Sequence, residues 1–287
     1  MTARAGPRMD RYPWPWAFLC GSVLTIAGCG GSQPGIYGFQ PTAAPLRYEI
    51  RATAESAVET PGGPQSVSVE ALATVSLRFG AATARGRRFD ATFESASLAT
   101  VREGERTEVE TGGLEGARYG GFLGAGGAIE LTDEPDLPTD LQAQSDWVSF
   151  VTDLLYPPPP RGDGTAEGWP HDYVLSTATS IAATAEYHGT VRFAGDTTWN
   201  GIRARLLISE GLATSYGSGT PEGAPGEVVF RLEGRRIRRY VWDPARGVLL
   251  AALLDGESAG QLRAAGYDLP MTRRSRQEAR LIEPARD

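Results

Sequence analysis

The sequence predicts a mostly β protein: a curved antiparallel sheet, built as a half-barrel or as a sandwich, with one covering helix near residues 139–156. Two observations support this prediction. Apolar and polar residues alternate with a period of two along several segments, which is the pattern of strands with one buried face. Turn signals rich in glycine and proline separate these segments at short intervals, as in strands joined by hairpins.

The clearest predicted strand covers residues 66–79. The apolar residues that share one face of it are Val67, Val69, Ala71, Ala73, Val75, Leu77 and Phe79, and Leu72 alone breaks the pattern. The same alternation predicts strands at residues 48–55, 89–93, 202–208 and 228–232. Hairpin turns are predicted at residues 61–64, 102–105, 112–113, 195–196 and 243–247.

One helix is predicted between two strand-rich stretches. Thr139 followed by Gln142 has the spacing of a capping box. The apolar residues at helical spacing are Leu141, Trp147, Val148, Val151, Leu154 and Leu155. Pro157–Pro160 end the helix, so residues 139–164 form a helix and a proline-rich connector.

The stretches on either side of the helix, residues 46–138 and 165–287, contain similar motifs in the same order. Leu77-Arg78-Phe79 and then Arg118-Tyr119 in the first half correspond to Val191-Arg192-Phe193 and then Arg239-Tyr240 in the second. The spacing between the motifs differs, however, and strands of alternating composition align easily. Duplication and chance similarity therefore both stay open.

The N-terminus resembles a bacterial lipoprotein signal. Arg4, Arg8 and Arg11 precede a short apolar run that ends in Ile26-Ala27-Gly28-Cys29, the layout of a lipobox. Residues 1–28 are thus the expected signal peptide, Cys29 the lipidated first residue, and residues 29–45 a flexible tether. The alternative is an ordinary signal peptide with a chance cysteine. The expected location is the cell envelope, lipid-anchored in the outer membrane and facing the periplasm, because Gly30 rather than Asp follows Cys29.

Composition excludes several function classes. The formal net charge of −7 argues against nucleic-acid binding. The chain contains no lysine, which rules out Schiff bases and P-loop chemistry. Its two histidines, His171 and His188, are too few for a typical zinc site, and no Gly-x-Ser-x-Gly elbow is present. We therefore nominate no catalytic residue, no metal ligand and no cofactor.

Two segments stand out as candidate binding elements. Residues 248–254 are apolar on both faces, which indicates either a strand covered on both sides or a cavity wall. The candidate ligand-facing residues are Val248, Leu250, Ala252 and Leu254. Arg235, Arg236, Arg238 and Arg239 surround Ile237 in a second predicted strand. They are interpreted as charges that protect an edge strand, or as contacts for anionic headgroups or for the carboxylates of a partner protein.

The lipobox, the tether and the curved sheet with its helix resemble the LolA and LolB lipoprotein carriers and related lipid-binding half-barrels. Pro157–Pro160 and Gly168-Trp169 also resemble a pattern in uncharacterised bacterial lipoproteins. The resemblance implies a non-enzymatic envelope lipoprotein that binds an apolar ligand (a lipid or acyl chain) or a partner protein. The alternatives are an assembly subunit of an outer-membrane complex, anchored by Trp199 and Trp242, and a hydrolase with a carboxylate pair.

Overall fold

The computed structural model describes residues 39–40, 42, 44–124, 128–138, 141, 147–155, 168–178, 181–220 and 226–282. All of them belong to one compact unit, Pro34–Asp287. The expected signal peptide and Cys29 lie outside the described residues. So do Thr139, Gln142 and Pro157–Pro160, on which the predicted helix ends depend.

Strands dominate the described part of the chain. They are β1 (Leu46–Thr60), β2 (Gly63–Thr83), β3 (Gly86–Arg102), β4 (Glu105–Val109), β5 (Arg118–Leu123), β6 (Ile129–Asp133), β7 (Trp169–Ala178), β8 (Ile181–Trp199), β9 (Ile202–Gly219), β10 (Val228–Asp243), β11 (Val248–Ala264) and β12 (Tyr267–Ile282). A 3₁₀ turn η1 (Gly112–Leu114) and helix α2 (Trp147–Thr152) accompany them. The five strands predicted by alternation lie within β1, β2, β3, β9 and β10, each of which is longer than expected.

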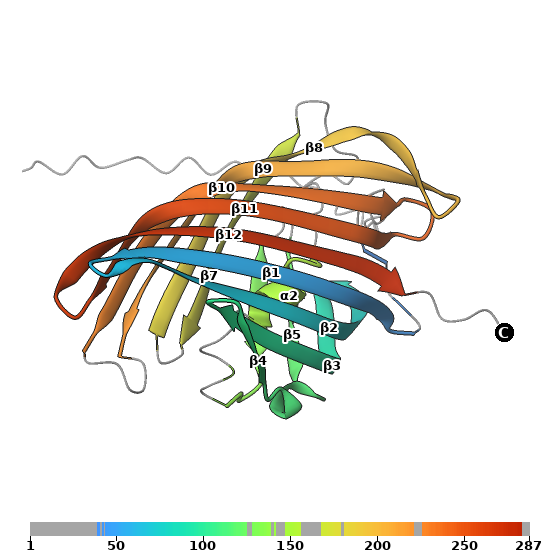
Figure 1. The fold of residues 1–287 in the computed structure, drawn as a ribbon. Helices are drawn as coiled ribbons and strands as arrows, with labels where there is room; N and C mark the ends of the chain where they lie inside the picture. The colour runs from blue at the N-terminus through green and yellow to red at the C-terminus, as the bar shows by residue number, and fades with distance from the viewer. Residues whose placement is uncertain are drawn as a thin grey trace, which may run out of the picture. The chain divides into compact units, whose positions relative to one another are not determined.

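All strands form one antiparallel 12-stranded sheet in the order β6-β5-β3-β2-β1-β12-β11-β10-β9-β8-β7, with β4 beside β3. The sheet curls around α2 (Figure 1). The prediction of a mostly β, curved antiparallel fold with a covering helix is therefore confirmed, as a single curved sheet and not as a sandwich. The first and last strands, β1 and β12, pair in its interior, and the two sequence halves meet there. Whether the halves are duplicates stays a hypothesis.

One face of the sheet carries the main hydrophobic core, and we call it the inner face; the opposite face is the outer face. The core unites side chains from both halves, among them Tyr48 of β1, Phe93 of β3, Trp169 of β7 and Tyr240 of β10. The apolar residues predicted for the helix region are all buried: Leu141, Trp147, Val148, Val151, Leu154 and Leu155. Since α2 contributes to a core shared by such distant strands, it lies inside the curve of the sheet.

The predicted tether ends earlier than expected. Phe39 is 2% exposed, stacks on Phe79 at 4.1 Å between ring centroids and meets Trp242 edge-on at 5.0 Å. The backbone N–H of Thr42 donates to the carbonyl of Phe79 at 3.1 Å. Phe39 is thus part of the core, so the expectation of a flexible chain as far as Pro45 is wrong from Phe39 onward.

Three of the five predicted hairpin turns are confirmed, at residues 61–64, 102–105 and 243–247. Gly112–Gly113 instead begin the 3₁₀ turn η1. Gly195 lies in a bulge of β8, and the hairpin comes later, at Asn200-Gly201. Both of these residues have positive φ, 47° and 79°, as a type I′ turn requires.

Glycines allow the sheet to bend tightly on its inner face. Gly189 of β8 pairs with Gly211 of β9, and a Cβ at Gly211 would overlap the carbonyl oxygen of His188. A Cβ at Gly234 of β10 would overlap the carbonyl oxygen of Glu257 in the same way. Glycine is the residue that lets strands kink where a sheet turns sharply. These positions thus explain how such long strands can curl.

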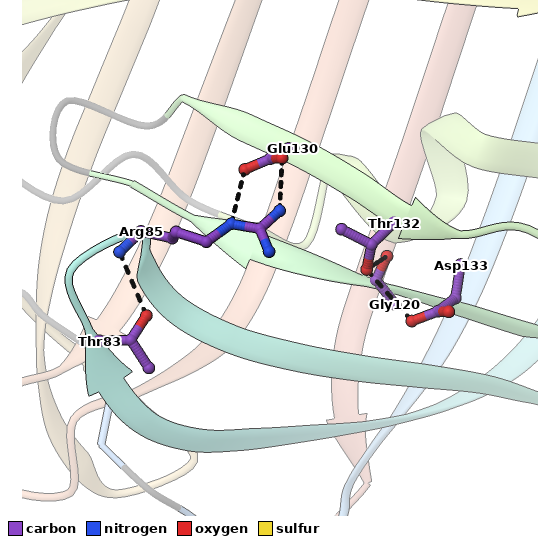
Figure 2. A network of polar contacts seen from close by, with 6 residues as sticks. All are labelled: Thr83, Arg85, Gly120, Glu130, Thr132 and Asp133. Carbon is purple, nitrogen blue, oxygen red and sulfur yellow. Dashed lines mark hydrogen bonds and ion pairs between the residues drawn. The ribbon is translucent and has the colours of Figure 1, made fainter.

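Edge strand β6 is fastened by polar contacts (Figure 2). Arg85, in the β2–β3 turn, forms a 2.5 Å ion pair with Glu130 of β6. Its guanidinium also lies 4.1 Å from the ring centroid of Phe122 in β5. The Thr132 hydroxyl donates to the backbone carbonyl of Gly120 in β5 at 3.4 Å. Because exposed pairs contribute little individually, we regard them as fixing the position of the edge and not as a major source of stability.

Candidate functional site

The inner face continues beyond the packed core toward the hairpin ends of the long strands. There it carries a group of half-buried apolar side chains, which we call the distal inner face: Val58, Val67, Phe230, Leu262, Leu269 and Met271. Val58 pairs with Met271, and Leu262 pairs with both Phe230 and Leu269. Since cross-strand partners point to the same side of a sheet, the apolar residues of β1, β10, β11 and β12 lie side by side, and Val67 of β2 lies on the same face, opposite Ser56.

A buried polar cluster lies between the distal inner face and α2. We call it the arginine–tyrosine cluster: Asp153, Tyr173, Tyr187, Arg236 and Arg238. Arg238 is 2% exposed, and its Nη2 donates to Asp153 Oδ1 at 3.0 Å and to the Tyr173 hydroxyl. Arg236 Nη1 donates to the same hydroxyl at 3.1 Å. The guanidinium of Arg238 also lies 4.6 Å from the ring centroid of Tyr187, a cation–π contact that offsets part of its desolvation.

His171 lies at the margin of this cluster. It is 4% exposed, and its Nδ1 is 2.9 Å from Ser209 Oγ, which is also 2.9 Å from the Tyr187 hydroxyl. Burial, followed by the positive charge of Arg238, lowers the pKa of His171 to about 3. Burial likewise raises the pKa of Tyr187. His171 is therefore neutral at physiological pH. Through Ser209, which contacts both His171 and Tyr187, hydrogen bonds link strands β7, β9 and β8.

Hollows of very different size lie near these groups. Two open hollows of about 550 Å³ each lie along the charged outer face, beside residues such as Glu55, Glu257 and Arg274. A hollow of about 30 Å³ lies beside Arg236. A hollow of only about 10 Å³, room for one water at most, lies beside Ala252 and Leu254.

The structure divides the candidate ligand-facing residues Val248, Leu250, Ala252 and Leu254 between two clusters. Val248 and Leu250 pack with Ala204 in a small separate cluster. Ala252 packs against the main core, and Leu254 lies beside it in β11. A bulge between Val241 and Trp242 of the neighbouring strand changes the register there. Alternation counted straight through residues 248–254 therefore could not predict which of them share a face.

The arginine-rich segment lies in β10, which is flanked by β9 and β11. The interpretation of Arg235–Arg239 as an edge strand is thus wrong. Arg236 and Arg238 lie on the inner face, whereas Arg235 and Arg239 pair with Glu210 and Asp255 on the outer face. Sequence reasoning identified this segment but did not associate it with Tyr173 and Tyr187.

The remaining candidate residues, Trp242, Trp199 and His188, do not form a common site. Trp242 is fully buried, which contradicts its predicted role as a surface anchor, and Trp199 is half-buried against the small cluster around Ala204. His188 is exposed, and its Nδ1 lies 3.3 Å from Asp172. Within the described ranges, no group of three or more His, Cys, Asp or Glu residues could hold a metal ion. No helix among the described residues has the length and apolar character needed to cross a membrane.

No family model matches the chain, and no curated protein is significantly similar to it.

Proposed function

We propose that this protein is a non-enzymatic, lipid-anchored component of the cell envelope that binds an apolar ligand, a lipid or acyl chain, on its distal inner face. The observation that supports the proposal is the apolar surface of Val58, Val67, Phe230, Leu262, Leu269 and Met271, which is only half-buried although it lies on the core-bearing side of the sheet. Contiguous apolar surface left open to solvent is typical of binding sites.

The distal inner face replaces the segment 248–254 as the site of binding in this proposal. The space beside Ala252 and Leu254 is too small for an acyl chain. The distal residues, in contrast, form rows across β1, β12, β11 and β10 that could each contact a long ligand. Such a surface is extended along the strands, which suits a chain-like molecule better than a compact one.

Two matched variants test whether the distal inner face binds lipid. Residues 34–287, exported to the periplasm behind a cleavable signal peptide without a lipobox and purified from there, are expected to retain non-covalently bound lipid detectable by mass spectrometry. Met271→Asp, which places a charge on the distal inner face, should reduce the retained lipid several-fold. Leu72→Asp is the control, because Leu72 is 42% exposed on the outer face. Equal lipid content in all three proteins, or none in the wild type, would refute this part of the proposal.

The proposed lipid anchor at Cys29 is tested by a separate experiment. Full-length wild type should fractionate with membranes after acylation of Cys29, whereas Cys29→Ser should remain unprocessed. Metabolic labelling with a fatty acid distinguishes the two proteins directly. A wild type that stays unlabelled in the soluble fraction would contradict the lipid anchor while leaving the ligand site untouched.

An assembly subunit is the second candidate, and one observation favours it. Val174 of β7 and Leu212 and Tyr216 of β9 are exposed side chains with apolar surface on the outer face, on either side of β8. Exposed apolar groups near a sheet edge suit a protein partner. Crosslinking in native membranes should then recover a second protein at these positions, and recovery of monomer alone would rule it out.

A further inference from the structure

The two faces of the sheet differ in how the charges of their arginines are compensated by acidic residues. The acidic residues along β9–β12, apart from Asp243 at the β10–β11 turn, lie on the outer face by register: Glu210, Glu233, Asp255, Glu257, Asp268 and Glu278. Each of them forms an ion pair with an arginine. The inner face of the same strands carries Arg236, Arg238 and Arg273, and also Arg205, which lies opposite Trp242 in register and 3.7 Å from Asp196. Asp153, from the turn after α2, forms an ion pair with Arg238.

Arg236 is an inner arginine that forms no ion pair with an acid among the described residues. Its hydrogen-bond partner in the described part of the chain is the neutral hydroxyl of Tyr173, at 3.1 Å. The side chain extends across Gly256, where a Cβ would lie 3.4 Å from Arg236 Cγ. It borders the hollow of about 30 Å³, which is also lined by Ser258, Ser275, Arg273 and Glu257; the carboxylate of Glu257 is paired with Arg274. That hollow has room for one or two water-sized groups.

Tyr173 gives the site a second donor. Its oxygen accepts hydrogen bonds from both Arg236 and Arg238, and a guanidinium has no acceptor to offer in return. The phenolic proton of Tyr173 therefore has no acceptor among these partners. Arg238 adds to the local positive charge, because its buried Nε and Nη1 make no hydrogen bond within the described residues. An oxygen anion at the hollow would accept from Arg236 and compensate the charge of that arginine.

We propose that Arg236, assisted by Tyr173, binds the anionic head group, carboxylate or phosphate, of an acyl-chain ligand whose chain lies on the distal inner face. The inference rests on the function proposed above and specifies the class of ligand. Leu232 and Phe230 follow Arg236 on the same face of β10, about 13 and 20 Å away at the usual rise of about 3.3 Å per residue. Along this face, the arginine is followed by small residues and then by apolar residues. An amphiphile fits this order, with its charged head at the arginine and its long chain along the apolar residues.

The test compares three ligands with the same chain: dodecanoate, dodecyl phosphate and dodecanol. The protein is residues 34–287, once circular dichroism and cooperative unfolding have established that this unit folds alone. Isothermal titration should show the anions binding about 10- to 100-fold more tightly than dodecanol, the range expected for a charge-assisted hydrogen bond. The tighter of the two anions identifies the head group as carboxylate or phosphate.

Variants assign the preference to Arg236. Arg236→Gln should abolish the preference for the anions, and Arg236→Lys, which keeps the charge, should retain most of it. Arg231→Gln, on the outer face of the same strand and paired with Glu233, should bind as the wild type does. Dodecanol that binds as tightly as both anions, or a preference that survives in Arg236→Gln, overturns the head-group site but leaves the apolar site standing. No binding of any dodecyl compound overturns the proposed function itself.

Discussion

Asp153 and Arg238 form an ion pair that joins the turn after α2 to the centre of the sheet, with side chains 12% and 2% exposed. Removing one partner of such a pair leaves a buried charge without compensation, which costs about 3–5 kcal/mol. Burial by itself lowers the pKa of Arg238, but Tyr173 and Asp153 outweigh it and the pKa stays well above its ordinary value. The cation therefore cannot escape the penalty by losing its proton.

This gives the first prediction. Asp153→Ala should lower the free energy of unfolding by about 3 kcal/mol or more, because it leaves the Arg238 cation unpaired. Arg238→Met should cost less, since Asp153 is nearer to water and Met fills the space. Urea unfolding of both variants and of the double variant measures the difference. A double variant less stable than Asp153→Ala alone would show that the arginine is not the source of the penalty.

His171 predicts a dependence of stability on pH. The pKa of its side chain is lowered to about 3 in the folded protein, from 6.5 as the ordinary value. Below about pH 6.5 the unfolded chain takes up a proton that the folded chain does not. The free energy of unfolding should therefore fall as the pH falls, by about 1.4 kcal/mol per pH unit more than in His171→Gln, between about pH 6 and 4. Parallel pH profiles of the two proteins would mean that His171 titrates normally.

At the scale of single elements, tight bending of the sheet depends on glycine. A Cβ at Gly211 would overlap the carbonyl oxygen of His188, so Gly211→Ala should destabilise the protein by about 3 kcal/mol or more. Leu212→Ala is the matched control, because Leu212 is the next residue and is 68% exposed on the outer face. Thermal unfolding of both variants checks the prediction, which is wrong if the two melt at similar temperatures.

Periodicity predicted elements well where one face is buried and the other is solvated. The segment 66–79 and the apolar side of α2 behave as expected because burial of the apolar face determines their orientation. Local exceptions to the period were not predictable by alternation, as the bulges at Gly195 and at Val241/Trp242 show. The β8–β9 hairpin, in contrast, could have been predicted from the sequence, because Asn-Gly is a strong hairpin signal. The turn lies at Asn200-Gly201 and not at the predicted Gly195-Asp196.

At the scale of the whole molecule, strand order is the property that the sequence left undetermined. Pairing of β1 with β12 joins segments more than 200 residues apart in the chain, and no local pattern encodes such a contact. For the same reason, Arg235–Arg239 was interpreted as an edge strand although β10 has a neighbour on each side. The arginine–tyrosine cluster also required this order, because Tyr173 and Arg236 lie on β7 and β10 and come together only through the curvature of the sheet.

The shared core predicts that the two sequence halves cannot fold separately. Tyr48 in the first half donates its hydroxyl to the carbonyl of Leu249 in the second at 2.9 Å, inside a cluster that draws on both halves. Residues 46–138 and 165–287, expressed alone, would each expose that cluster and an unpaired edge at β1 or β12. Each fragment should therefore lack cooperative unfolding by circular dichroism, and mixing the two should restore it. A fragment that unfolds cooperatively by itself would instead indicate two autonomous halves and would favour duplication.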